Sequence, residues 1–322
     1  MAKYRNKLPQ LADRLFLTDG GIETTLVFLE GHELPHFAAF DLLKTEKGKR
    51  ALSDYFTRYI TLANAHGTGF VLESPTWRAN ADWGDKLGYS TAALAEMNRK
   101  SIALMAELRD RHETKNSPIV ISGCVGPRGD GYDPGRVMSV EEAAAYHMSQ
   151  IKTFRETEAD MVTAITMTNA NEAIGVVRAA ATVAMPVVIS FTVETDGRLP
   201  TGQSLEDAIE AVDTATARSP AYYMINCAHP THFEDALAAG EDWVVRVRGI
   251  RANASKRSHA ELDQAKDLDD GDAAELGRQY RDLRREFSHF NVLGGCCGTD
   301  HRHVEQICFA CTAAEADMQA AE

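Results

Sequence analysis

The sequence of 322 residues contains no apolar run near the length of a membrane span, and its first residues lead into no signal-peptide core. A membrane-spanning helix needs about 20 apolar residues, so we expect a cytoplasmic protein with no membrane partner. Positive charge is also scarce, because 34 Lys and Arg residues stand against 47 Asp and Glu residues and leave a net charge of -13. A surface of that sign repels nucleic acid and anionic lipid, so we expect neither as a partner.

Two further absences bear on the class of fold. The first apolar run ends in Asp19-Gly20-Gly21-Ile22, which lacks the third glycine of a dinucleotide-binding turn. The chain also shows no internal repeat and no low-complexity tract. Its apolar and charged fractions, 44% and 25%, are typical of a globular enzyme. We predict one domain over residues 1–322 and leave the choice between monomer and homo-oligomer open.

Short apolar runs alternate with longer amphipathic segments along the chain. Runs such as Val187-Val188-Ile189-Ser190-Phe191 are typical of parallel strands buried on both faces. The expected strands cover residues 15–19, 69–73, 119–123, 161–166, 187–192, 222–226, 243–247 and 290–293, and the clearest helices cover 91–111, 139–157, 204–217, 272–287 and 301–321. Eight such units predict a single (β/α)8 TIM barrel, with the polar stretch 255–272 as a long loop on its catalytic face.

Three cysteines are placed to meet at one rim of this barrel. Cys296 and Cys297 are adjacent and framed by glycines, which suits a turn that aims both sulfurs at one point. Cys227 follows the sixth expected strand, and the pair follows the eighth. The ends of parallel barrel strands share one face, so the three thiolates are expected to converge there. Three soft ligands with a fourth position open predict a catalytic zinc site.

The charge of this ligand set indicates what the open position holds. Three thiolates weaken the Lewis acidity of the ion. Such a site is better suited to binding and deprotonating a substrate thiol than to activating a water molecule as a nucleophile. The predicted reaction is therefore alkyl transfer to sulfur. Two alternatives stay open: a zinc-dependent hydrolase or lyase that uses metal-bound water, and a non-catalytic protein that binds zinc or thiols.

The remaining cysteines are not expected to bind metal. In a cytosolic chain, six cysteines indicate metal ligands and buried thiols rather than disulfides. Cys308 and Cys311 have CxxC spacing but lie in a predicted helix, so we expect plain thiols there.

The chain resembles the zinc-dependent homocysteine S-methyltransferases over nearly its whole length. The resemblance is carried by residues 17–26, 74–80, 126–127, 226–227 and 295–299. It implies a (β/α)8 barrel, zinc held by Cys227, Cys296 and Cys297, and methyl transfer to the thiol of homocysteine in methionine biosynthesis. It also implies that Asp19 and Gly20 contact the polar end of the acceptor. Glu73, Thr76, Trp77 and Asn226 are the further residues expected to bind substrate.

One position departs from the family pattern. Many members carry a glutamate at the end of the fourth strand that holds the acceptor's amino group, and this chain has Ile165 there. Losing a charge-assisted hydrogen bond costs about 1.5–3 kcal/mol. Either Glu73 or Glu194 compensates, or the acceptor is a related thiol; we expect thiol methylation with altered acceptor selectivity.

The methyl donor is expected to be a small onium compound. The chain has no room for the separate folate and cobalamin modules of the large methionine synthases. Donors of the S-methylmethionine, S-adenosylmethionine or betaine type carry a positive charge, which aromatic rings attract. Trp77 and Tyr132 are the predicted lining residues.

Overall fold

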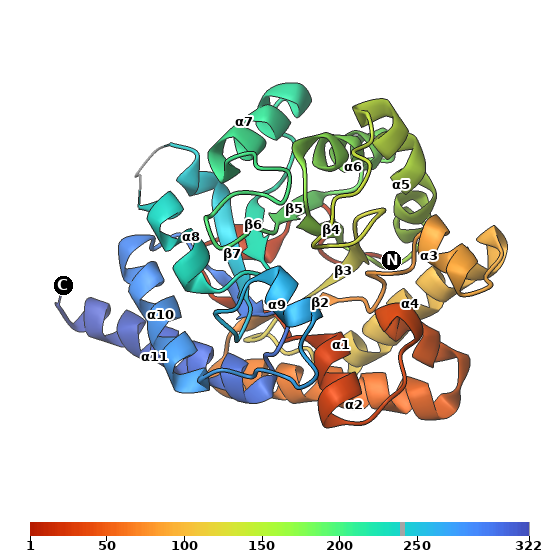
Figure 1. Ribbon diagram of the computed structural model, residues 1–322. Helices are drawn as coiled ribbons and strands as arrows, with labels where there is room; N and C mark the ends of the chain where they lie inside the picture. The colour runs from red at the N-terminus through yellow and green to blue at the C-terminus, as the bar shows by residue number, and fades with distance from the viewer. Residues whose placement is uncertain (239–241, 322) are drawn as a thin grey trace.

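Eight parallel strands close into a barrel in the order in which they occur along the chain (Figure 1). The computed structural model describes residues 1–238 and 242–321. The strands are β1 (Phe16–Leu17), β2 (Gly69–Glu73), β3 (Ile119–Val125), β4 (Met161–Met167), β5 (Val187–Phe191), β6 (Tyr223–Asn226), β7 (Val247–Ala252) and β8 (Val292–Gly295). Pairing of Phe16 with Val292 closes the barrel between β1 and β8. The predicted (β/α)8 fold is confirmed, and of the predicted domain residues 239–241 and 322 lie outside the described part.

Helices surround the barrel (Figure 1). They are α1 (Ile22–Thr24), α2 (Glu46–His66), α3 (Ala81–Lys86), α4 (Thr91–His112), α5 (Val140–Arg155), α6 (Ala170–Thr182), α7 (Leu205–Thr216), α8 (Pro230–Leu237), α9 (His259–Asp263), α10 (Ala273–Glu286) and α11 (His301–Ala321). A capping box begins α5, where Ser139 and Glu142 bond each other's backbone N–H groups. Among the described residues, no helix has the length and apolar character needed to cross a membrane.

The alternation of side chains along the strands divides the barrel interior into layers. An apolar cluster fills the interior at the start of the strands and includes Phe16, Val71, Val120 and Met161. Side chains two residues further along a strand point to the same face, so the residues above this cluster also face inward. On β2 the residue above Val71 is Glu73. The barrel therefore has an apolar floor and a polar layer above it.

The position predicted for the seventh strand is wrong. Residues 243–247 were expected to form it, but Val244–Arg246 is a 3₁₀ turn and β7 runs from Val247 to Ala252. The sequence of β7 does not form a continuous apolar run, because Arg248 and Arg251 interrupt it. Arg248 bonds the backbone oxygens of the N-terminal segment, and Arg251 forms a buried ion pair at the opposite end.

The stretch 255–272 is also more ordered than a plain loop. It contains α9, which begins with a capping box formed by Ser258 and Glu261. In Figure 1, α9 lies in front of the barrel opening. The predicted long loop on the catalytic face thus carries a short helix.

Replacing Phe154 tests the packing of the helix ring on the barrel. Phe154 on α5 is fully buried and its ring lies against Gly123 of β3. Phe154→Ala is expected to lower the free energy of unfolding by about 3–5 kcal/mol, because it removes a buried ring and leaves a cavity. Urea unfolding measures the change. Phe309→Ala is the matched control, since Phe309 on α11 is 63% exposed and its loss is expected to change stability little.

Candidate active site

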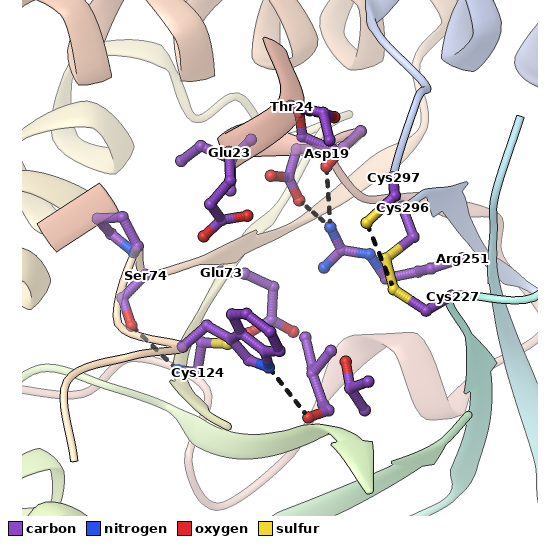
Figure 2. A pocket seen from close by; sticks show the side chains of 17 residues that line it. Asp19, Glu23, Thr24, Glu73, Ser74, Cys124, Cys227, Arg251, Cys296 and Cys297 are labelled. Atoms are coloured by element: carbon purple, nitrogen blue, oxygen red, sulfur yellow. Dashed lines mark hydrogen bonds and ion pairs between the residues drawn. A yellow bond between two sulfur atoms is a disulfide. The ribbon is translucent and has the colours of Figure 1, made fainter. Parts of the chain in front are cut away.

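The three predicted cysteines converge at the mouth of the barrel. Their sulfurs lie within 4.8 Å of one another, and 3.8 Å separates Cys227 Sγ from Cys297 Sγ (Figure 2). Cys227 and Cys296 are joined in this structure as a disulfide, which corrects the expectation that no cysteines pair. The physical reason is the convergence itself, because three sulfurs aimed at one point also come within bonding reach of one another. With the disulfide reduced, three thiolates at these positions form a donor set suited to a soft metal ion.

The backbone after β7 holds both cysteine loops in place. Asn253 Nδ2 donates a hydrogen bond to the Cys227 carbonyl oxygen, and Ala254 N–H donates to that of Cys297. Cys227 itself has a φ of +54°, in the left-handed region that few non-glycine residues adopt. This turn lets the chain leave β6 with its sulfur facing the β8 loop, and such strain is common at functional sites.

Side chains around the sulfurs form a connected polar network. The Tyr132 hydroxyl lies 3.5 Å from Cys297 Sγ, and its ring stacks on that of His259 with centroids 4.0 Å apart. His259 bonds the Cys227 carbonyl oxygen through Nε2 and Glu194 through Nδ1. Burial raises the pKa of Tyr132 well above its usual value, so the hydroxyl stays protonated and can donate to sulfur.

A buried ion pair borders the cavity that the three sulfurs line, which we call the inner cavity. Arg251 Nη2 donates to Asp19 Oδ1 at 2.6 Å, while Arg251 Nε donates to the carbonyl oxygen of Gly295. Tyr55 donates to the other carboxylate oxygen of Asp19. Figure 2 shows Arg251 lying between Asp19 and the three sulfurs. Asp19 thus has partners within the protein.

Two further carboxyl groups face this cavity without an ion-pair partner among the described residues. They are Glu23, in α1, and Glu73, at the end of β2. Burial raises the pKa of each to about 7. The cavity therefore offers groups that can accept hydrogen bonds from a cationic ligand. Its full lining is Asp19, Gly20, Gly21, Ile22, Glu23, Thr24, Glu73, Ser74, Pro75, Trp77, Cys124, Ile165, Thr166, Cys227, Arg251, Cys296 and Cys297.

Most of the predicted substrate-binding residues lie in this lining, but two lie behind it. Thr76 is fully buried and donates to the Cys124 carbonyl oxygen. Asn226 is also fully buried; it bonds Thr166 and Ser190 and lies 3.9 Å from Cys296 Sγ. Both support the wall of the cavity from behind. Their expected contact with substrate remains a prediction.

Arg251, Glu23 and Thr166 line the site but were not among the residues predicted from sequence. Arg251 lies in the strand that was misplaced, and Glu23 follows the Gly20-Gly21 turn that had already been singled out. Thr166 has a φ of +64°, held by its hydrogen bonds with Asn226. The position of Glu23, in the turn after β1, could have indicated its place in the site. The backbone strain at Thr166 has no corresponding signal in the sequence.

An outer chamber of about 390 Å³ opens above the sulfurs. Its lining includes Trp77, Tyr132 and the exposed Phe28, together with carboxylates from the loops. These carboxylates are Glu23, Asp130, Asp263, Asp267 and Asp269. Arg78 also lines the chamber, pairs with Asp130, and places its guanidinium 4.1 Å from the centre of the Trp77 ring. One face of that aromatic ring is thus already in contact with a cation.

The sequence pattern of the homocysteine S-methyltransferase family matches residues 16–311. The chain belongs to the homocysteine S-methyltransferase family. Three crystal structures of the homocysteine methyltransferase MmuM from Escherichia coli are similar to it. The oxidized form has a TM-score of 0.72 and 19% identity and covers 95% of this chain and 99% of MmuM. The metallated form has a TM-score of 0.71 and 18% identity over 92% and 96%, and the apo form 0.64 and 18% over 95% and 98%.

Membership of the homocysteine S-methyltransferase family makes this chain a thiol S-methyltransferase. It implies a small-molecule thiol as acceptor and a second small molecule as methyl donor. The similarity to MmuM agrees with the barrel described above. The class of enzyme that the three cysteines predicted is confirmed.

The pKa of Glu73 predicts how stability changes with pH. The folded protein binds the Glu73 proton more tightly than the unfolded chain, because burial raises the pKa from 4.5 to about 7. Stability is therefore lost as pH rises from about 4.5 to about 7. In the metal-free, reduced protein, Glu73→Gln is expected to gain about 3 kcal/mol relative to wild type between pH 4.5 and pH 8.

Urea unfolding at a series of pH values measures this difference. The matched control is Glu210→Gln, because Glu210 is an exposed residue of α7. It should leave the pH dependence of stability as in wild type. A Glu73→Gln protein whose stability parallels wild type across this range would contradict the assignment.

Proposed function

We propose that the protein is a zinc-dependent S-methyltransferase that moves a methyl group from a small onium donor to homocysteine or a related thiol. The observation that carries the proposal is the meeting of three cysteine sulfurs at the open mouth of the barrel. Three thiolates fit zinc and leave a fourth tetrahedral position for a ligand. When bound, zinc supplies the Lewis acidity that keeps a substrate thiol deprotonated at neutral pH.

The cysteines and the network around them prepare the acceptor sulfur. Cys227, Cys296 and Cys297 would hold the ion as thiolates, and their negative charge keeps the incoming sulfur electron-rich and nucleophilic. The Tyr132 hydroxyl, through its contact with Cys297, withdraws part of that charge and orients the sulfur. No general base would be needed, because a zinc ion held by these thiolates would lower the pKa of the bound thiol so that its proton passes to the solvent.

The two connected spaces divide the substrates between them. The inner cavity includes the charged side chains of Asp19, Glu73 and Arg251 in its lining, which suit the acceptor's head group. The outer chamber is acidic and partly aromatic, which suits a cation of the S-methylmethionine, S-adenosylmethionine or betaine type. The acceptor sulfur then attacks the methyl carbon in line; the new C–S bond forms as the bond to the onium atom breaks, and the donor leaves without its positive charge.

Replacing one predicted ligand tests the metal centre. Cys297→Ser is expected to lose bound zinc and thiol-dependent methyl transfer, because a serine hydroxyl is a poor zinc ligand. Metal content by atomic emission and methyl transfer from S-methylmethionine to homocysteine measure the two effects. Cys308→Ser is the matched control, since Cys308 lies on α11, away from the cavity lining. Full activity in Cys297→Ser would remove the central claim.

The hydroxyl of Tyr132 has its own test. Tyr132→Phe keeps the ring that stacks on His259 and removes only the contact with Cys297 Sγ. We expect zinc affinity or activity to fall by about 10- to 100-fold, as is usual when a hydrogen bond to a metal ligand is lost. Competition with a zinc chelator measures the affinity. Unchanged zinc affinity together with unchanged turnover would leave the hydroxyl without a role.

A further inference from the structure

One buried carboxylate oxygen in the inner cavity has no hydrogen-bond partner. Glu73 is only 5% exposed, and its Oε2 atom makes no hydrogen bond to any described residue. Buried polar atoms are nearly always paired, so an unpaired one calls for an explanation. Glu73 lines the same cavity as the three cysteine sulfurs (Figure 2). The missing partner is therefore expected to be a ligand of that cavity.

The position of Glu73 in the barrel leaves its Oε2 atom without a hydrogen-bond partner among the described residues. It lies in the polar layer above Val71, where the neighbouring Ser122 and Thr163 hydroxyls bond each other at 2.7 Å. Arg251 is the nearest source of positive charge, but its Nη2 and Nε bond Asp19 and the carbonyl oxygen of Gly295. Hydrogen bonding of Ser122 and Thr163 to the carboxyl group partly offsets the effect of burial on the pKa of Glu73, but its Oε2 atom accepts no hydrogen bond from any described residue.

The other acidic and apolar side chains nearby narrow the choice of ligand-binding group. Ile165, at the position where many family members carry a glutamate, lines the cavity with an apolar side chain. Glu194, which the sequence left as an equal candidate, bonds His259 instead and is absent from the cavity lining. Glu73 on β2 therefore offers the cavity the carboxylate that β4 does not.

We propose that Glu73 binds the ammonium group of the acceptor, so that the acceptor is an aminothiol. This proposal rests on the proposed function, because it places the acceptor's sulfur at the three cysteines. An ammonium supplies three hydrogen-bond donors and a full charge, which meets both needs of a buried carboxylate. A thiol without an amino group supplies neither and leaves Oε2 unpaired. The carboxylate has thus moved from β4 to β2 while the amino-group preference is kept.

The test compares two acceptors that differ only in the amino group. Homocysteine and 4-sulfanylbutanoate are titrated into the zinc-loaded protein by calorimetry, which reads binding without turnover. Wild type is expected to bind homocysteine about 10- to 150-fold more tightly, the usual range for a charge-assisted hydrogen bond. Equal affinity for the two thiols overturns the proposal without the need for any variant.

Variants then assign the preference to one carboxylate. Glu73→Gln is expected to remove the preference by weakening homocysteine alone, and adding Ile165→Glu to Glu73→Gln is expected to restore part of it. Glu23→Gln is the matched comparison, because Glu23 is the other carboxyl group of this cavity that has no ion-pair partner among the described residues. A preference that survives in Glu73→Gln, or that disappears in Glu23→Gln instead, overturns the assignment.

Failure of this proposal is distinguishable from failure of the proposed function. Methyl transfer to both thiols with no amino-group preference refutes the role of Glu73 and leaves the methyltransferase intact. A Glu73-dependent preference in binding, with no methyl transfer from any onium donor, supports the role of Glu73 and refutes the proposed reaction.

Discussion

The geometry of the barrel mouth depends on one buried guanidinium. Arg251 extends from β7 past the end of β8 to the first residue after β1 that carries a charge, and it bonds both Gly295 and Asp19. Such a pair adds little net stability, because removing two charges from water costs about as much as their attraction returns. Its effect is on position: it sets the end of β8, from which Cys296 and Cys297 follow, against β1. The ends of β1, β7 and β8 therefore fix the position of Cys296 and Cys297 in the site.

The sequence predicted the parts of this structure whose signals are local. Seven of the eight strands are found close to their expected positions, because parallel strands buried on both faces read as continuous apolar runs. The meeting of Cys227 with the pair at 296–297 was predictable too, since strand ends share one face of a barrel. β7 was misplaced because Trp243-Val244-Val245 imitates a strand, while Arg248 and Arg251 break the pattern of the true one.

What the sequence left undecided depends on partners that come from distant strands. Whether Glu73 or Glu194 compensates for Ile165 cannot be read from either residue alone, because both follow apolar strands. The difference is that His259 of α9 bonds Glu194, whereas no described residue donates a hydrogen bond to Glu73 Oε2. The pairing of Cys227 with Cys296 is likewise a property of the assembled mouth. Tertiary contacts decide both.

The long separation between the cysteines has a consequence for the folding of the barrel. Cys227 and Cys296 are 69 positions apart in the sequence, and this span includes all of β7 and β8. Any link between these sulfurs, through a metal ion or directly, closes that span into a ring. Closing a ring of this size removes about 4 kcal/mol of chain entropy from the unfolded state. The cysteines thus also act as a cross-link that encloses the last two strands of the barrel. The same sulfur atoms that would bind the metal ion would therefore also stabilise the folded chain.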